Sequence, residues 1–257
     1  LRDRTGGDAV IALLATLGSS IPVVAHRGMN YRLDFFNRLK YHHPRVHAIV
    51  AVSQATMKVI ADSSTRLGRK TEVVYQAAAD CHFHPEDPLR LRREFGIPAN
   101  VHVVAVAANL IPRKGHRVFV ECIPSILAEF PETRFVFIGG GSSTHLLGSH
   151  DLSSAGAIFT GFRTDVHELL PSVTVSVNPA IEGEGLTGTT RESLAAGVPV
   201  VVTDVAGTRE LVEDGISGFV IPRGDSQALG EAIKRLLRDP DLRLRMGRAG
   251  RARVASM

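Results

Sequence analysis

The sequence predicts an α/β protein built on parallel, doubly wound sheets. Segments with strand character alternate with helical segments along most of the 257 residues, which is typical of βαβ units with right-handed crossovers. Residues 101–107 (VHVVAVA) form a mainly apolar run, as expected for a strand that is buried on both faces of a parallel sheet. Glycine or polar residues follow several of these strands, and ligands of parallel sheets bind at such carboxyl ends.

The expected elements fall into two groups. In the first group, strands are expected at residues 21–25, 48–52 and 72–75, and helices at 9–17, 33–39 and 53–63. In the second group, strands are expected at 101–107, 134–138, 157–159, 173–177, 198–202 and 218–221. The helices of the second group are expected at 115–129, 165–170, 190–196, 207–213 and 226–238.

The apolar segment 9–17 is too short to span a bilayer and fits a buried helix.

The boundary between the two groups of strands lies in the stretch 81–98, which contains three prolines. We therefore place a domain boundary after residue 84, which gives domains at 1–84 and 85–257.

Composition limits the classes of protein to which the chain can belong. Hydrophobic residues make up 44% of the chain and charged residues 22%, which is ordinary for a globular protein with a sizeable core. The net charge of +4 is too small to indicate binding to nucleic acid, but it fits an anionic ligand or membrane surface. Cys81 and Cys122 lie far apart and form no metal or redox motif. They favour a reducing compartment, and we expect a cytoplasmic protein.

Residues 178–204 (NPAIEGEGLTGTTRESLAAGVPVVVTD) contain the richest cluster of candidate binding residues. A glycine-rich loop follows a β-branched strand and leads into a helix, with Glu184 in the loop and Glu192 in the helix. Free N–H groups at the start of a helix bind phosphate. A carboxylate beside such a site repels phosphate, so it suits sugar hydroxyls as a hydrogen-bond acceptor. The segment is therefore a candidate site for a phosphate-bearing sugar.

A purely structural interpretation of the same segment stays open. Thr189 and Glu192 have the spacing of a capping box, so Glu192 could serve only to cap a helix that runs from about residue 190 to 196. Glu182 and Glu184 could be no more than exposed loop carboxylates. Spacing alone favours this interpretation, because capping boxes are common.

Other candidate binding residues also follow predicted strands. Arg113 and Lys114 stand where cations suit a diphosphate, although a solvated basic turn has equal weight. Residues 139–141 are three glycines, but they do not make the GxGxxG fingerprint of a dinucleotide site. His26 follows the predicted strand 21–25 and could bind a hydroxyl or transfer a proton, although a structural histidine is the commoner case.

The arginine-rich stretch 239–253 is expected to be a helix with a solvated face. Contact of this stretch with a membrane surface is a minority interpretation, because few large apolar residues accompany the charges.

Taken together, these motifs resemble glycosyltransferase family 4, the retaining nucleotide-sugar transferases of the GT-B fold. The matching segments occur in the order of the family over most of the chain. They are Ala51-Val52-Ser53, Phe83-His84-Pro85, Pro112-Arg113-Lys114-Gly115-His116, Phe137-Ile138-Gly139-Gly140-Gly141, Gly161-Phe162, Glu184-Gly185-Leu186 and the run ESLAAGVPVV at 192–201. The last two segments form the Glu-x7-Glu motif of the family.

The resemblance implies two Rossmann-like domains of the GT-B type. Residues 1–84 would be a partial, acceptor-side N-terminal domain, and residues 85–257 the domain that binds the nucleotide sugar. In the catalytic centre, Glu184 would hold hydroxyls of the donor sugar, and His26 would reach the same sugar.

The resemblance also implies a set of donor-binding residues. Lys114 would contact the donor diphosphate and Glu192 the ribose. The others, which would act through the backbone, at a glycine turn or as a second cation, are Gly185, Leu186, Thr187, Gly140 and Arg113.

The sequence departs from the family pattern in several places. Asn109 stands where the family often has an arginine, and Arg113 could replace that cation. Residues 76–79 (QAAA) replace an Asn-Gly-Val-Asp junction motif. Parts of the family pattern before Leu1 and after Met257 have no counterpart, so we expect a member that is truncated at both ends.

The expected reaction is a retaining transfer of a hexosyl group from a nucleotide sugar to a glycan or lipid-linked acceptor. It would need no metal ion or other cofactor and would serve cell-envelope polysaccharide synthesis, with peripheral contact at the inner face of the membrane. Glu184 would position the sugar rather than attack it. Two alternatives stay open: a GT-B nucleotide-sugar epimerase, and a non-catalytic fragment that binds nucleotide sugars.

Overall fold

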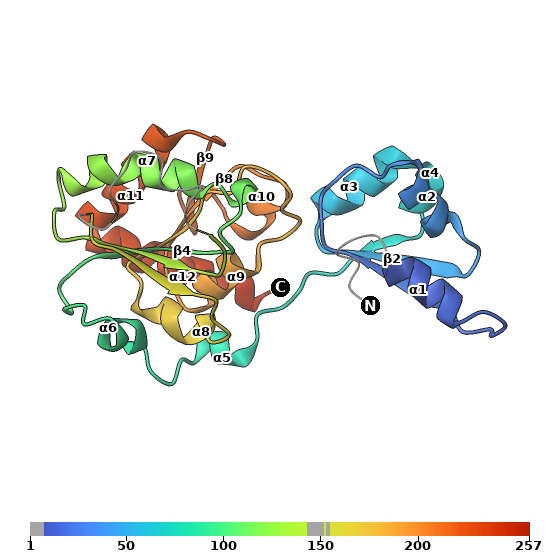
Figure 1. Cartoon of the computed structure of the whole chain (residues 1–257), viewed down its shortest axis with the longest axis horizontal. Helices are drawn as coiled ribbons and strands as arrows, with labels where there is room; N and C mark the ends of the chain where they lie inside the picture. The colour runs from blue at the N-terminus through green and yellow to red at the C-terminus, as the bar shows by residue number, and fades with distance from the viewer. Residues whose placement is uncertain (1–7, 143–151, 153–154) are drawn as a thin grey trace. The chain divides into compact units, whose positions relative to one another are not determined.

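The structure is a computed structural model that describes residues 8–142, 152 and 155–257. The chain divides into two compact units (Figure 1). One comprises Leu1–Gln76 and Gly183–Leu186, and the other comprises Ala77–Glu182 and Thr187–Met257. The division after Gln76 falls a few residues before the predicted domain boundary, which was placed after residue 84. The short helix α5 (Asp80–Phe83) therefore belongs to the second unit.

The first unit contains a three-stranded parallel sheet in the order β1-β2-β3. Its strands are β1 (Val23–Arg27), β2 (Val46–Ala51) and β3 (Thr71–Val73). Its helices are α1 (Asp8–Ala15), α2 (Phe35–His42), α3 (Gln54–Ser63) and α4 (Thr65–Gly68). Tyr41, Ile49 and Ile60 are fully buried in its core. Ser53 caps α3, because its hydroxyl accepts the Thr56 N–H at 3.1 Å.

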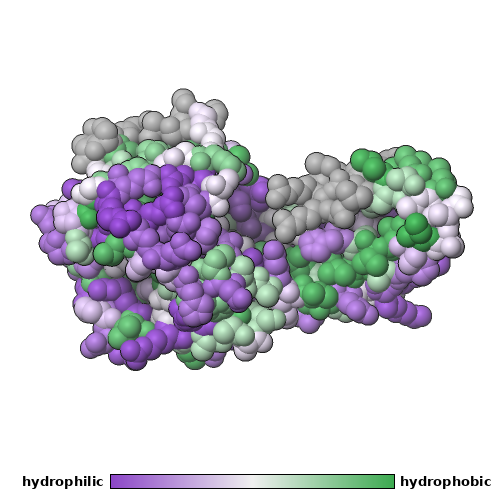
Figure 2. Space-filling view, turned by 90° about the horizontal axis from the view of Figure 1, so that it is seen from below, coloured by the Kyte–Doolittle hydropathy of each residue, from purple (hydrophilic) through white to green (hydrophobic). Residues whose placement is uncertain are grey.

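Helix α1 differs from its prediction as a buried helix. Ala9 is buried, but Val10, Ile11 and Leu14 are exposed. Figure 2 shows apolar side chains at the surface of this unit. The helix is apolar around its whole circumference, and only one side of it packs on the described residues.

The second unit contains a six-stranded parallel sheet in the order β6-β5-β4-β7-β8-β9. Its strands are β4 (Val103–Ala107), β5 (Arg134–Ile138), β6 (Ala157–Gly161), β7 (Val175–Asn178), β8 (Val200–Thr203) and β9 (Gly218–Ile221). The chain places β5 and β6 on one side of β4, and then β7, β8 and β9 on the other side. Such a reversal opens a crevice at the carboxyl ends of the two central strands. The predicted doubly wound sheet is confirmed.

Helices cover both faces of this sheet (Figure 1). One face carries α7 (His116–Leu127) and α11 (Ser226–Arg238), and the other carries α6 (Arg90–Glu94), α8 (Val166–Leu169), η3 (Leu170–Ser172) and α9 (Gly188–Ala195). The remaining elements are η1 (Pro112–Lys114), α10 (Thr208–Leu211) and α12 (Pro240–Ala255). All residues of β4 are buried, with Val104 facing the α7 side and Ala105 the α6 side. The prediction that this run is buried on both faces is therefore confirmed.

Helix α12 is more deeply packed than its arginine content indicated. Its residues Met246, Gly247, Gly250 and Val254 are buried. A Cβ on Gly247 would lie 2.1 Å from the Gly197 carbonyl oxygen just after α9, so only glycine allows this contact. The helix thus supports α9, the element that carries Glu192.

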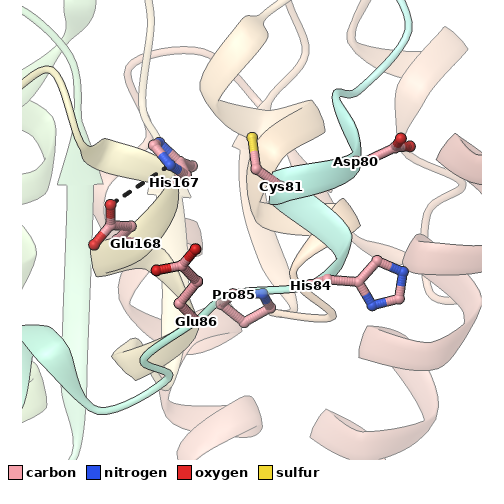
Figure 3. A pocket seen from close by; sticks show the side chains of 7 residues that line it. All are labelled: Asp80, Cys81, His84, Pro85, Glu86, His167 and Glu168. Atoms are coloured by element: carbon pink, nitrogen blue, oxygen red, sulfur yellow. Dashed lines mark ion pairs between the residues drawn. The ribbon is translucent and has the colours of Figure 1, made fainter.

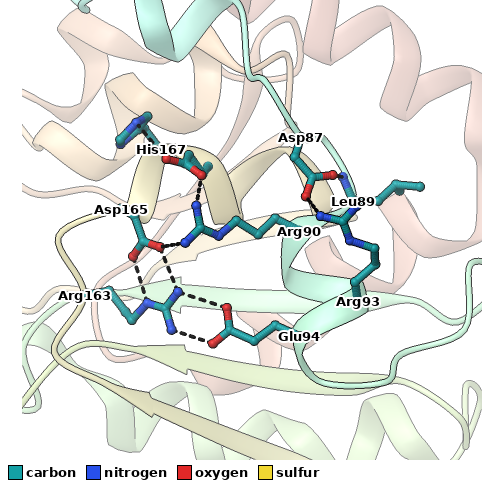
Figure 4. A network of polar contacts seen from close by, with 9 residues as sticks. Asp87, Leu89, Arg90, Arg93, Glu94, Arg163, Asp165 and His167 are labelled. Atoms are coloured by element: carbon teal, nitrogen blue, oxygen red, sulfur yellow. Dashed lines mark hydrogen bonds and ion pairs between the residues drawn. The ribbon is translucent and has the colours of Figure 1, made fainter.

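Charged side chains join α6 to the turn before α8 (Figure 4). The Arg163 guanidinium binds Glu94 at 2.5 Å and Asp165 at 2.8 Å. Arg90 binds Asp165 at 2.7 Å and also pairs with Glu168. This network fixes the turn that follows β6.

None of the helices formed by the described residues is both long and apolar enough to cross a membrane.

Candidate functional site

The turn that carries Arg113 and Lys114 is packed against the segment that follows β7. Gly115 ends this turn with a φ of 67°, and a Cβ on it would lie 1.8 Å from the Pro179 carbonyl oxygen. Both the backbone angle and the lack of space therefore require glycine. The Ile181 N–H donates to the Arg113 carbonyl oxygen at 2.9 Å. The two predicted cations are thus fixed at the carboxyl edge of the sheet, beside the end of β7.

Asn178, the last residue of β7, holds the start of α9 in place. Its Nδ2 donates to Oγ1 of Thr187 at 3.1 Å and of Thr190 at 3.3 Å. Its Oδ1 accepts the Ala180 N–H at 3.4 Å. Asn178, Thr187 and Thr190 are all buried. The side chain of Asn178 therefore links the first turn of α9 to the segment that packs on the Lys114 turn.

The predicted capping box is wrong. Helix α9 begins at Gly188 rather than near residue 190, and its N-cap is Thr187 instead of Thr189. The Thr187 hydroxyl makes no cap hydrogen bond and accepts from Asn178 instead. The first-turn N–H groups of α9 therefore have no side-chain cap from the described residue at the N-cap. An uncapped start of a helix favours an anion.

Glu192 lies along the first turns of α9 and is half-buried. Its Oε1 would be 3.6 Å from a Cβ placed on Gly188. Helix α5 packs beside α9, and the His82 Nδ1 accepts the Ala79 N–H at 3.0 Å. Burial lowers the pKa of His82, while the Glu192 carboxylate opposes that shift. Glu192 is thus a carboxylate at the helix end where an anion would bind, and it does not serve as the predicted cap.

The glycine turn after β5 lies at the same edge of the sheet. The Leu110 N–H donates to the Gly140 carbonyl oxygen at 2.8 Å. A Cβ on Gly140 would lie 3.2 Å from Cβ of Phe162, whose side chain is largely exposed. The turn therefore borders the residues that follow β4 and β6.

The remaining predicted residues belong to the first unit. Glu184, Gly185 and Leu186 group with that unit. Glu184 is only 8% exposed, so its interpretation as an exposed loop carboxylate is wrong, whereas Glu182 is exposed. His26 lies within β1 rather than after it.

A cavity of about 300 Å³ lies between α5 and α8 (Figure 3). Its lining includes Cys81, His84, Glu86 and His167. No predicted donor-binding residue lines this cavity, so it is separate from the site at the ends of β4 and β7.

Residues 101–239 match the family described as glycosyl transferases group 1, and these residues are more than half of the chain. The chain belongs to this family. Two curated relatives illustrate the extent of the similarity. EpsD of Bacillus subtilis (strain 168) is 33% identical over 193 residues, which are 72% of this chain and 50% of EpsD. A phosphatidyl-myo-inositol mannosyltransferase of Mycobacterium leprae (strain TN) is 34% identical over 146 residues, 54% of this chain and 38% of that protein. The chain thus spans half or less of the length of these relatives.

Solved structures support the GT-B fold of this group 1 chain. Anabaena HepE in complex with UDP and glucose has a TM-score of 0.85 and 22% identity, covering 98% of this chain and 72% of HepE. A Rickettsia africae glycosyltransferase has a TM-score of 0.84 and 20% identity, covering 99% of this chain and 70% of that protein. The two Rossmann-like units expected from the sequence are therefore confirmed as the fold class.

Proposed function

We propose that the protein is a family 4 glycosyltransferase that moves a hexosyl group, with retention of configuration, from a nucleotide sugar to a glycan or lipid-linked acceptor. The observation that carries the proposal is the junction around residues 178–181. On one side of this segment lies the cationic turn with Lys114, and on the other lies the uncapped start of α9. Together they present positive charge and N–H donors suited to a diphosphate.

The proposed chemistry follows from the charge of the leaving group. When the bond between the sugar C1 and the diphosphate oxygen breaks, negative charge develops on the diphosphate. Lys114, Arg113 and the first-turn N–H groups of α9 stabilise this charge, which is the main electrostatic demand of the reaction. The acceptor oxygen forms the new bond to C1, and its proton passes to the departing diphosphate oxygen. These donors supply the positive charge, and we propose that the reaction needs no metal ion.

The carboxylates have a different role in this proposal. Glu192 accepts hydrogen bonds from the ribose hydroxyls, since its Oε1 lies at the first turn of α9. Glu184 and His26 are assigned to the donor sugar by the family resemblance, together with the backbone N–H groups of Gly185, Leu186 and Thr187. Glu184 positions the sugar and does not form a covalent intermediate.

The similar proteins support the choice of donor and acceptor classes. HepE has been solved with UDP-glucose, and a Corynebacterium glutamicum relative is a GDP-mannose-dependent mannosyltransferase that acts on a phosphatidylinositol monomannoside. These names support a UDP- or GDP-linked hexose and a lipid-linked or glycan acceptor. We further propose that the protein is cytoplasmic and meets its acceptor at the inner face of the membrane.

A transfer assay with defined sugars tests the proposal. The chain is incubated with UDP-glucose or GDP-mannose and a panel of glycan and lipid-linked acceptors, with EDTA in one series and without it in another. The expected product keeps the anomeric configuration of the donor, as read by NMR of C1, and forms at the same rate with and without EDTA. An epimerised nucleotide sugar, or a product of inverted configuration, would contradict the proposal.

A further inference from the structure

Arg191 is a buried arginine of α9 that the proposed chemistry does not use. Only 4% of its surface is exposed. It lies one turn after Gly188, the first residue of the helix, so the two residues share one face of α9. Long side chains on a helix point back toward its start, and Nη2 of Arg191 lies 3.8 Å from the position that a Cβ on Gly188 would take. The guanidinium is therefore held at the helix end that is proposed to bind phosphate.

The charge of Arg191 stands at the unfavourable end of the helix. A guanidinium stays charged in proteins, and the start of a helix carries a partial positive charge that favours anions over cations. The N-cap residue Thr187 offers no side-chain hydrogen bond to the first-turn N–H groups. Positive charge and N–H donors are thus gathered at one place, which suits a phosphate group.

Gly188 leaves an open space between Arg191 and Glu192. Oε1 of Glu192 would lie 3.6 Å from a Cβ on Gly188, the same point that the Arg191 guanidinium approaches. These are ordinary contact distances, and the φ angle of Gly188 is not positive, so the backbone accepts alanine at this position. Alanine is also the better helix former. A ligand that approaches the first-turn N–H groups between the two charged groups would explain the glycine.

We propose that Arg191 binds the phosphate group that is joined to the ribose of the nucleotide, while Lys114 binds the outer phosphate, which carries the sugar. The inference rests on the proposed function, in which Glu192 holds the ribose. One sugar ring separates the ribose hydroxyls from the first phosphate, so a carboxylate and a guanidinium that border one point suit these two groups. Lys114 lies across the segment 178–181 from α9, where the second phosphate would follow.

The guanidinium can take this role while it keeps contacts within the protein. It carries five N–H donors, so it can bind a phosphate and a protein acceptor at the same time. Its planar fork matches two oxygens of a phosphate group.

A series of ligands with no, one and two phosphates tests the assignment. The chain is titrated by NMR with uridine, UMP and UDP, and with the guanosine counterparts. Arg191→Met removes the charge and keeps an unbranched side chain. We expect it to leave the affinity for the nucleoside unchanged and to weaken binding of the monophosphate and the diphosphate by the same factor, about tenfold. Lys114→Ala should weaken binding of the diphosphate at least about tenfold and of the monophosphate much less.

Arg243 of α12 provides the control for a partly buried arginine with a structural role. Its Nη1 donates to the carbonyl oxygens of Leu236 and Leu237 at 2.6 and 2.9 Å, near the end of α11. Arg243→Met should lower the melting temperature and leave the affinity for all ligands of the series unchanged. Arg191→Lys keeps the charge but loses the fork, so it should recover part of the affinity for the monophosphate.

Two results would overturn the inference. In one, Arg191→Met binds the monophosphate and the diphosphate like the unaltered chain. In the other, it weakens binding of the nucleoside as much as that of the phosphates, which would show that Arg191 only supports the helix. In either case the proposed function stands if Lys114→Ala still weakens binding of the diphosphate. If the unaltered chain binds no ligand of the series, the proposed function fails, and the inference fails with it.

Discussion

Asn178 donates a hydrogen bond from Nδ2 to Oγ1 of Thr187 at 3.1 Å, and this contact anchors the start of α9 at the carboxyl end of β7. The same amide nitrogen reaches the Thr190 hydroxyl at 3.3 Å. All three side chains are buried, and the Asn178 amide donates to both hydroxyls at the helix start. The position of the helix end, and of the N–H groups at it, therefore depends on one side chain.

Replacement of Asn178 should cost more than replacement of either threonine. Asn178→Ala leaves two buried hydroxyls without their amide donor, which predicts a loss of about 2–3 kcal/mol in the free energy of unfolding. Thr187→Val removes one hydrogen bond and should cost about 1 kcal/mol. Urea unfolding monitored by circular dichroism measures both values. Equal losses in the two variants would show that the shared amide is not the anchor.

Gly115 and Gly96 form a matched pair for testing the close contact of the Lys114 turn. Both have positive φ angles, 67° and 62°, but a Cβ on Gly96 meets nothing within 4 Å. Gly96→Ala should therefore cost only the backbone strain of about 1 kcal/mol. Gly115→Ala also forces a Cβ against Pro179, so its loss of stability should be at least about 3 kcal/mol. Similar melting temperatures for the two variants would contradict the packing of the turn on Pro179.

The buried imidazole of His116 predicts a loss of stability in mild acid. Its pKa is about 4 in the folded chain and about 6.5 in the unfolded chain, so the unfolded state binds more protons between these values. Stability is complete above about pH 6.5 and falls as the pH drops to 4, by about 3 kcal/mol from this group. Urea unfolding of the unaltered chain and of His116→Phe from pH 7 to pH 4 measures the difference. If both variants lose stability in parallel, His116 is not the group responsible.

The ionic network at α6 should contribute more to stability than an exposed ion pair. Arg163 is 19% exposed in its side chain and binds two carboxylates. Its replacement by Met leaves Glu94 and Asp165 without this partner, which predicts a loss of about 1–2 kcal/mol that salt reduces only partly. Lys58→Met breaks the exposed pair with Asp62 and should cost less than about 0.5 kcal/mol. Chemical unfolding at two salt concentrations compares the variants, and equal losses would argue against the network.

Much of the fold could be predicted from local patterns. Strands β5 and β9 have the predicted bounds, since each is a short run of buried residues between turn residues. The Ser53 cap of α3 was also predictable, because a cap depends only on residues within one helical turn. The burial of β4 on both faces followed from its apolar composition.

The errors concern contacts between residues that are distant in sequence. The start of α9 was misplaced, and the side chain that holds this helix start, Asn178, lies nine positions before Thr187. Burial of α12 depends on Gly247 meeting Gly197, and glycines in a helix carry no pattern that indicates a partner. His116 belongs to the basic motif at 112–116, and nothing in the sequence indicates that its ring is buried in the core.

The central claim is that the ends of β4 and β7 form a nucleoside diphosphate site with Lys114 as its cation. Isothermal titration of the chain with UDP and with GDP tests it most directly. Arg117, three residues along, is 81% exposed and pairs with Glu121, so Arg117→Ala is the matched loss of a positive charge. We predict that one nucleotide binds, that Lys114→Ala weakens its affinity at least about tenfold, and that Arg117→Ala leaves it unchanged. No binding of either nucleotide, or equal effects of the two substitutions, would contradict the account.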